Sequence, residues 1–270
     1  MITFYDTHAH LDFPDFAADL PETIERALAA GIGKLITIGT DFTSSRRAVA
    51  LSREYPQVHA VVGWHPSHVT AAPDDVRPEL RELAREPKVV AIGETGLDYH
   101  RLPGNDAGGG GTAAREYRSR QRRLFEQQME VAAELGLNCV VHQRDAFDDV
   151  LSAMIPFAGK LRGVFHCFGG TPAQARAVID AGGLVSFTGI VTFRNAGVVR
   201  ETAAAVPDGR FMLETDCPYL APVPYRGKRC EPAYVRQIAE TVAGARGCSL
   251  EELSRMTCRT AAEFFRGLQG

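Results

Sequence analysis

Residues 5–12 read YDTHAHLD and place two histidines, His8 and His10, one residue apart after a short apolar run. If this run is a strand, residues i and i+2 point to the same face, so the two imidazoles aim at one point. Imidazole nitrogen is a common metal ligand, but two hydrogen-bonded histidines at a strand end would show the same spacing. The pattern alone leaves both interpretations open.

Further histidines and acidic residues follow other apolar runs. Glu94 follows KVVAIG, His142 follows NCVV and His166 follows GVF. Asp216 follows RFMLET, and the motif GWHP after the third run adds His65. Each residue alone has an ordinary explanation as a core histidine, a helix cap or the partner of an arginine. Their repeated position at strand ends predicts that they converge on one edge of a sheet, which favours a metal site.

The number of donors points to two metal ions. Four imidazoles and two carboxylates exceed the three or four protein ligands of one tetrahedral ion. The histidines of the first strand would hold one ion, and those of the fifth and sixth strands the other. Glu94 would bridge the ions, and Asp216 would complete the first site and accept a proton from the attacking water. The predicted metal ligands are His8, His10, Glu94, His142, His166 and Asp216, with Asp216 and Glu94 as the catalytic residues.

The rest of the chain predicts the elements that hold these residues. Eight apolar or β-branched runs read as strands: 2–6, 34–39, 58–63, 88–93, 138–142, 162–166, 183–188 and 210–215. Segments of helical pattern lie between and after them: 21–30, 43–54, 75–86, 115–136, 145–155, 172–181, 195–205 and 232–245. This alternation is typical of a (β/α)8 TIM barrel, which carries its chemistry at the carboxyl ends of the strands. A doubly wound open sheet is the alternative, but the glycine-rich phosphate loop expected after its first strand is missing.

We therefore predict a single α/β domain over residues 1–270, a TIM barrel with an extra C-terminal helix at about 249–268. Ser249 and Glu252 have the spacing of a capping box at the start of that helix. The stretch LPGNDAGGGGTAAREY, 102–117, follows the fourth strand, and its four consecutive glycines predict a flexible insertion over 102–116.

The bulk composition argues against several classes of protein. With 30 basic and 33 acidic residues, the net charge of −3 does not suit binding of duplex DNA by charge alone. Six cysteines without a C-x-x-C pair, and no apolar signal segment in the first ten residues, predict reduced thiols and a cytoplasmic location. No apolar run approaches the roughly 18 residues of a membrane span.

Six motifs in order, DTHAHLD, GWHP, AIGETGLDYH, VVHQRDA, FHCFGG and LETDCPYL, resemble those of TatD-type metal-dependent deoxyribonucleases, a branch of the amidohydrolase-like barrels. The resemblance covers essentially the whole chain. It implies a TIM barrel, a pair of divalent ions and hydrolysis of DNA phosphodiester bonds, and it assigns metal binding to the six residues named above. A mixed nitrogen and oxygen donor set suits Zn, Mn, Fe or Co better than Ca, and Mg completes the candidates.

The sequence departs from the family pattern at three places. The glycine-rich insertion at 103–114 is longer than usual, Cys217 replaces a more common serine or alanine, and Cys230 replaces a common asparagine. None of them is a predicted metal ligand.

Several polar residues near the predicted rim could hold a substrate. Arginine suits phosphate because its guanidinium donates two hydrogen bonds at once. His65 could donate to a phosphate oxygen or brace the loop before Pro66, whereas Asp98 is expected to orient a ligand or a loop. Arg229 and Arg194 are weaker candidates. We expect single-stranded DNA or DNA ends as the substrate, bound by His65, Arg144, Arg226 and Lys228.

Other functions remain open from the sequence. A binuclear hydrolase of the same superfamily could act on a lactone, amide or phosphotriester, but such sites often use a carboxylated lysine, and Lys88 lies at the start of its strand. Ester cleavage on D-aminoacyl-tRNA, reported among TatD-like proteins, is a related alternative. A non-catalytic metal-binding protein would be expected to lack the acid that activates water, yet Asp216 is present.

Overall fold

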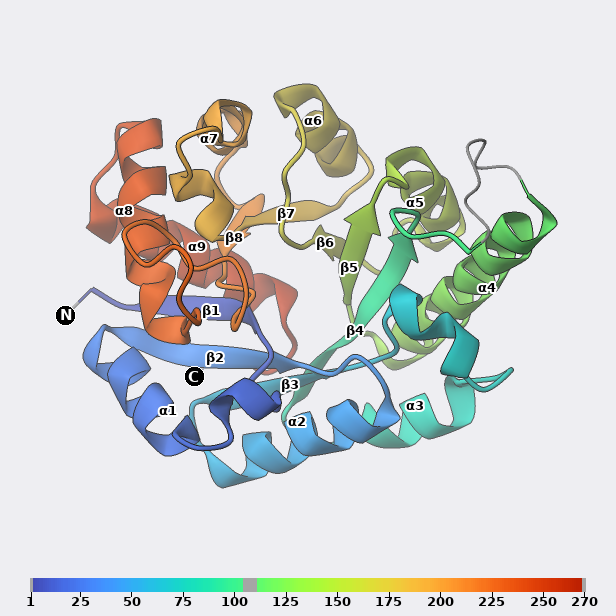
Figure 1. The fold of residues 1–270 in the computed structure, drawn as a ribbon. Coiled ribbons are helices and arrows are strands. Elements are labelled where there is room, and N and C mark those ends of the chain that lie inside the picture. The colour runs from blue at the N-terminus through green and yellow to red at the C-terminus, as the bar shows by residue number, and fades with distance from the viewer. Residues whose placement is uncertain (1, 104–110, 269–270) are drawn as a thin grey trace.

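The computed structural model of the chain describes residues 2–103 and 111–268 and confirms the predicted (β/α)8 barrel (Figure 1). Eight parallel strands follow one another in chain order. They are β1 (Phe4–Ala9), β2 (Ile32–Ile38), β3 (Val58–Val62), β4 (Val89–Asp98), β5 (Cys139–Arg144), β6 (Gly163–Phe165), β7 (Leu184–Phe187) and β8 (Phe211–Leu213). The barrel closes where the backbone N–H of Asp216 donates to His8 O at 2.9 Å and that of His10 donates to Cys217 O at 2.9 Å.

Helices surround the strands (Figure 1). They are α1 (Leu20–Ala29), α2 (Phe42–Glu54), α3 (Arg77–Leu83), α4 (Thr112–Leu135), α5 (Phe147–Met154), α6 (Pro172–Asp180), α7 (Gly197–Ala205), α8 (Val235–Arg246) and α9 (Leu250–Phe264). Short 3-10 turns lie at Pro14–Phe16, Pro66–Ala71, Ile155–Phe157, Gly189–Thr192 and Pro232–Tyr234. None of the helices in the described ranges has the length and apolar character that a bilayer span requires. Of the predicted insertion 102–116, residues 104–110 lie outside the described residues.

The extra helix α9 covers the end of the barrel where the strands begin. Phe264, Phe265 and Leu268 pack in one cluster with strand residues such as Ile36 and Val61. The Arg266 N–H donates to Val90 O at 3.2 Å, and the Asn138 side chain donates to Phe264 O at 2.6 Å. The predicted capping box is present, because Ser249 Oγ accepts from the Glu252 N–H and the Glu252 carboxylate accepts from the Ser249 N–H. The opposite end of the barrel, where the strands end, is the end at which the predicted site residues lie.

Strand β4 extends to Asp98, five residues beyond the predicted end at 93, so Glu94 lies inside the strand. The pairing of β4 with β5 shifts register between Ile92 and Thr95 and continues as far as Asp98. Gly96 has a φ of +136°, and a Cβ there would lie 2.0 Å from His142 O. Only glycine permits this close approach of the two strands, which brings Glu94 and His142 together.

Replacing Gly96 with alanine should therefore lower the free energy of unfolding by about 3 kcal/mol or more, because β4 and β5 must separate and the φ is unfavourable. Guanidinium denaturation of the purified protein measures this change. The matched control is Gly244→Ala in α8, where an added Cβ meets nothing within 4 Å. The control should be neutral or more stable by up to about 1 kcal/mol. Equal stability of the two variants would contradict the close approach.

Candidate metal centre

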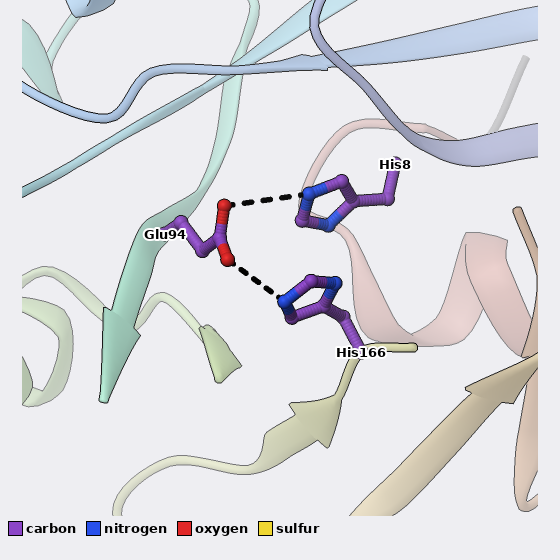
Figure 2. A group of neighbouring side chains, drawn as sticks. All are labelled: His8, Glu94 and His166. Atoms are coloured by element: carbon purple, nitrogen blue, oxygen red, sulfur yellow. Dashed lines mark ion pairs between the residues drawn. The ribbon is translucent and has the colours of Figure 1, made fainter. Parts of the chain in front are cut away.

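Glu94 lies at the centre of the site, buried at the carboxyl ends of the strands (Figure 2). Its Oε2 is 3.5 Å from Nε2 of His8 and 3.8 Å from Nε2 of His10. Its Oε1 is 2.8 Å from Nε2 of His166 and 2.9 Å from Nδ1 of His142. Each carboxylate oxygen thus faces a different pair of histidines, which is the arrangement that a carboxylate bridging two cations requires.

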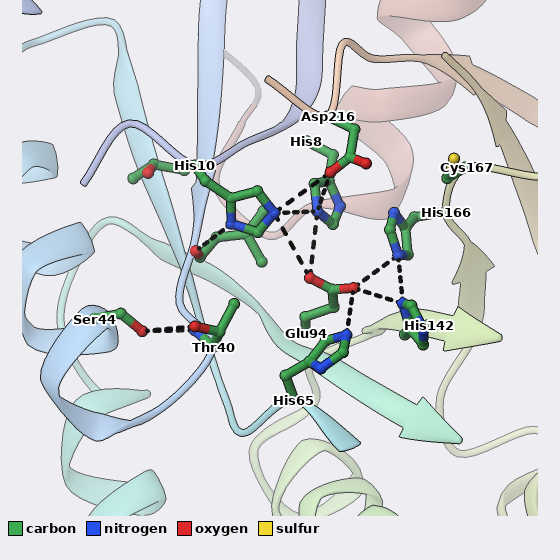
Figure 3. A network of polar contacts seen from close by, with 12 residues as sticks. His8, His10, Thr40, Ser44, His65, Glu94, His142, His166, Cys167 and Asp216 are labelled. Carbon is green, nitrogen blue, oxygen red and sulfur yellow. Dashed lines mark hydrogen bonds and ion pairs between the residues drawn. The ribbon is translucent and has the colours of Figure 1, made fainter. Parts of the chain in front are cut away.

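The first group consists of His8, His10 and Asp216, and Oε2 of Glu94 faces its two histidines (Figure 3). The Nε2 atoms of the two histidines are 3.3 Å apart. Asp216 Oδ1 lies 3.6 Å from Nε2 of His8 and 3.4 Å from Nε2 of His10. A tetrahedral ion with bonds of about 2.0–2.1 Å separates its ligand atoms by about 3.4 Å. The donor atoms and their spacing therefore fit one divalent cation.

The second group consists of His142, His166 and Oε1 of Glu94. Nδ1 of His142 and Nε2 of His166 are 3.2 Å apart, close to the spacing in the first group. This group offers three protein donors, which leaves room for water or substrate oxygen in the coordination of an ion. The six residues predicted as ligands are all brought together. His8, His10 and Asp216 lie on one side of the Glu94 carboxylate, and His142 and His166 lie on the other.

Other acceptors hold the histidine rings in place. Nδ1 of His10 lies 3.2 Å from Ile38 O, so its proton belongs on that nitrogen and Nε2 faces the site. Nε2 of His142 is 3.3 Å from Asp98 Oδ2. Such contacts to the second ring nitrogen fix the tautomer and the orientation of a ligating histidine. Asp98 therefore contacts a predicted ligand, in the orienting position expected of it.

Two buried acidic residues that the sequence analysis did not select support the site. Asp6 accepts hydrogen bonds from the backbone N–H and hydroxyl of Thr215 at 2.9 and 2.6 Å, and so ties β1 to the segment after β8. Glu214 accepts from the Cys167 N–H at 2.6 Å and lies 3.8 Å from Nδ1 of His166. The signal for both was an acidic residue within or directly after a predicted strand.

The charges at the site are strongly coupled. Burial alone would raise the pKa of Glu94, but His166, His65 and His142 hold it well below its usual range. Burial opposes protonation of His10, yet the carboxylates of Asp216 and Glu94 raise its pKa to about 9. The buried carboxylates therefore attract positive charge, and a divalent ion would supply it with neutral imidazoles as ligands.

His65 lies inside the site, with Nε2 3.3 Å from Glu94 Oε1. Its Nδ1 accepts a hydrogen bond from the Ser67 backbone N–H at 3.1 Å, so the neutral ring carries its proton on Nε2. Burial lowers the pKa of His65 and favours this neutral form. His65 is thus placed as a hydrogen-bond donor toward the centre, although its nitrogen is also close enough to Glu94 and His142 to form a third cluster of potential ligands.

The arginines and the lysine that were predicted to bind substrate occupy different positions. Arg144 lines a cavity of ≈ 890 Å³ together with His142, His166 and Asp216. Arg226 and Lys228 are exposed. The Arg226 guanidinium lies 3.7 Å from the centre of the Phe193 ring.

Two further basic side chains are held in other interactions. Arg229 donates two hydrogen bonds to the Asp19 carboxylate, at 2.7 and 2.8 Å, which leaves it poorly placed for a phosphate. Lys88 immediately precedes β4, and its Nζ donates to three carbonyls in and after the last turn of α2, those of Ser52, Tyr55 and Pro56. It cannot serve as a carboxylated lysine at the opposite end of the barrel.

All six cysteines are free thiols. Cys139 is buried, whereas Cys167 is only partly buried and lines the cavity beside His166. Burial holds the pKa of Cys167 well above its usual range, so the group stays a neutral thiol. Cys217 and Cys230 are buried.

Comparison of the sequence with known proteins identifies relatives along nearly the whole chain. A family profile described as TatD related DNase matches residues 5–266. The uncharacterized metal-dependent hydrolase YabD of Bacillus subtilis is 36% identical, with 97% of this chain and 98% of that protein covered. The 3'-5' ssDNA/RNA exonuclease TatD of Erwinia billingiae is 35% identical, with 97% and 98% covered.

Solved structures show the same architecture. YjjV, a TatD homolog from Escherichia coli, superposes with a TM-score of 0.86 at 27% identity, covering 98% of this chain and 99% of that one. The phosphotriesterase homology protein of Escherichia coli, solved with phosphate in its active site, gives a TM-score of 0.69 at 15% identity, with 97% and 98% covered. The second comparison shows the shared fold alone.

The geometry predicts about two divalent ions per chain. In a variant that carries both His8→Ala and His10→Ala, the first group loses two of its donors, and we expect roughly half of the metal to be lost. Elemental analysis of carefully purified protein measures the metal content. The matched control is His100→Ala, which removes an exposed histidine that pairs with Asp145. Unchanged metal content in the double variant would remove the first group from the assignment.

Proposed function

Because the chain belongs to the TatD-related DNase family of metal-dependent hydrolases, we propose that it hydrolyses phosphodiester bonds of single-stranded DNA with a pair of divalent ions. The observation that carries this proposal is the division of the Glu94 carboxylate between two groups of histidines. One cation would be held by His8, His10 and Asp216, and the other by His142 and His166, with Glu94 shared. Such ions activate water and stabilise the charge that develops on a phosphate.

Asp216 is the residue best placed to take the proton of the attacking water. Burial would raise its pKa, but hydrogen bonding to His10 and the nearby His8 and His166 lower it. Asp216 is therefore a carboxylate at neutral pH, and its Oδ1 faces the space beside the two histidines of β1. A base within reach of the water can accept its proton as the new P–O bond forms.

The chain's own donors would hold the phosphate. His65 presents an N–H toward the centre, Arg144 lines the adjoining cavity, and Arg226 and Lys228 are exposed. The relative from Erwinia billingiae, named as a single-strand DNA and RNA exonuclease, supports a nucleic acid with free ends. Local contacts of this kind do not need a strongly basic protein, in accord with the net charge of −3.

A substrate panel tests the proposal directly. Purified protein supplied with Mn or Mg is incubated with single-stranded DNA, RNA, an aminoacyl-tRNA and a lactone. We expect cleavage of the single-stranded nucleic acid. Robust hydrolysis of the lactone or the aminoacyl ester without phosphodiester cleavage would assign the site to another class of ester.

Replacing Asp216 with asparagine keeps the shape and one coordinating oxygen but removes most of the basicity. We expect the metal to remain largely bound while kcat falls by a factor on the order of 10² or more, the range for a positioned acid or base. Steady-state assays on a short oligonucleotide, beside metal analysis, separate the two effects. Turnover equal to that of the unaltered protein would exclude Asp216 from the proton transfer.

Arg226 and Lys228 are expected to bind the phosphate backbone at a distance from the metals. Replacing both with alanine should raise KM for an oligonucleotide. It should also flatten the dependence of log KM on log salt by about 1.4, at about 0.7 for each lost single-strand contact. The control variant is Lys160→Ala with Arg259→Ala, two exposed cations elsewhere on the surface. Equal changes in both double variants would mean that net charge alone is responsible.

A further inference from the structure

The cavity beside the metal centre has two walls of different chemistry. His142, His166 and Asp216 form its inner side, next to the expected position of the phosphate. Ile190, Tyr219 and Leu220 add a largely apolar wall. Its volume of ≈ 890 Å³ is much larger than a phosphate group needs. A phosphate gains nothing from an apolar wall, so the cavity is built for a further part of the substrate.

We propose that this cavity receives a nucleobase of the single-stranded substrate, which stacks on the ring of Tyr219 while its phosphate lies at the metal centre. The inference rests on the proposed function and adds a base-binding site to it. Flat apolar surfaces beside a phosphate site suit a nucleotide, because every base has a face that stacks on an aromatic ring. A base in duplex DNA is already paired and stacked, so such a site selects unpaired ends.

Tyr219 is placed for this role. Its side chain is unusually open for a large aromatic residue, with 54% of the residue exposed. The Phe13 ring meets it edge-to-face at 6.1 Å between centroids, and Phe13 itself stacks on His10 at 4.7 Å. A chain of ring contacts therefore connects Tyr219 to a predicted metal ligand.

The segment from Asp216 to Leu220 holds the base site at a set position relative to the reacting phosphate. Asp216 and Leu220 have φ values of +59° and +56°, a conformation that is rare for such side chains. A Cβ at Gly189 would lie 2.0 Å from Leu220 O, so the segment packs directly against that glycine. Backbone conformations of this kind persist where the surroundings impose them, and they cluster at functional sites. One short segment thus supplies both the proton acceptor and the proposed stacking ring.

The test compares two substrates on the unaltered enzyme and on variants at Tyr219. One substrate is a short oligomer of deoxyadenosine, and the other has the same phosphate backbone with stable abasic residues. The unaltered enzyme should show a kcat/KM for the adenosine oligomer at least about 5-fold above that for the abasic oligomer, the lower end of the stacking range. In Tyr219→Ala this ratio should fall toward 1, whereas Tyr219→Phe should retain it because the ring remains.

The control is Tyr117→Ala, a tyrosine on α4 that does not line the cavity. It should keep the ratio of the unaltered enzyme. Equal kcat/KM on the two substrates by the unaltered enzyme would overturn the base site while leaving the phosphodiesterase function intact. A ratio that survives in Tyr219→Ala would overturn the role of Tyr219. Hydrolysis of neither substrate would refute the proposed function and this inference with it.

Discussion

The structure depends on one buried carboxylate, that of Glu94, set among imidazoles from four other strands or their loops. A charged group out of water is costly unless opposite charge and hydrogen-bond donors surround it. Here His142 and His166 approach one oxygen, and His8 and His10 face the other. The two cations that we propose would satisfy this demand better than protons, because they would leave the imidazole nitrogens free to act as ligands.

The barrel provides the rigidity that this arrangement needs. The proposed ligands at β1 and after β8 are far apart in sequence, yet they would share one cation. The hydrogen bonds of Asp6 to Thr215, and of Asp216 N–H to His8 O, fix them across the closing seam. At the opposite end, the packing of α9 against the strand starts keeps the interior filled. Stability and chemistry are thus located at opposite ends of the same strands.

The surroundings of the proposed metal centre decide which substrate can reach it. A shared barrel fold does not fix the substrate, because the same architecture supports different functions. The similarity to the phosphotriesterase homology protein extends to the fold alone. Specificity must come from loops at the rim, where Arg144 and the exposed cations of the 222–232 loop suit phosphate. The apolar wall formed by Ile190, Tyr219 and Leu220 adds a surface that a base can use. A nucleic acid offers both kinds of group in one molecule.

Local periodicity in the sequence determined the eight strands and their order. It also determined the end of the barrel at which His8, His142 and Asp216 would meet, because side-chain alternation and chain direction are properties of short segments. The tertiary structure alone decided which histidines face each carboxylate oxygen of Glu94. This arrangement depends on the extended β4 and its close approach to β5 at Gly96. It likewise paired Arg229 with Asp19, removing a cation that the sequence left available. Contacts between residues some two hundred positions apart depend on closure of the barrel, which no local pattern encodes.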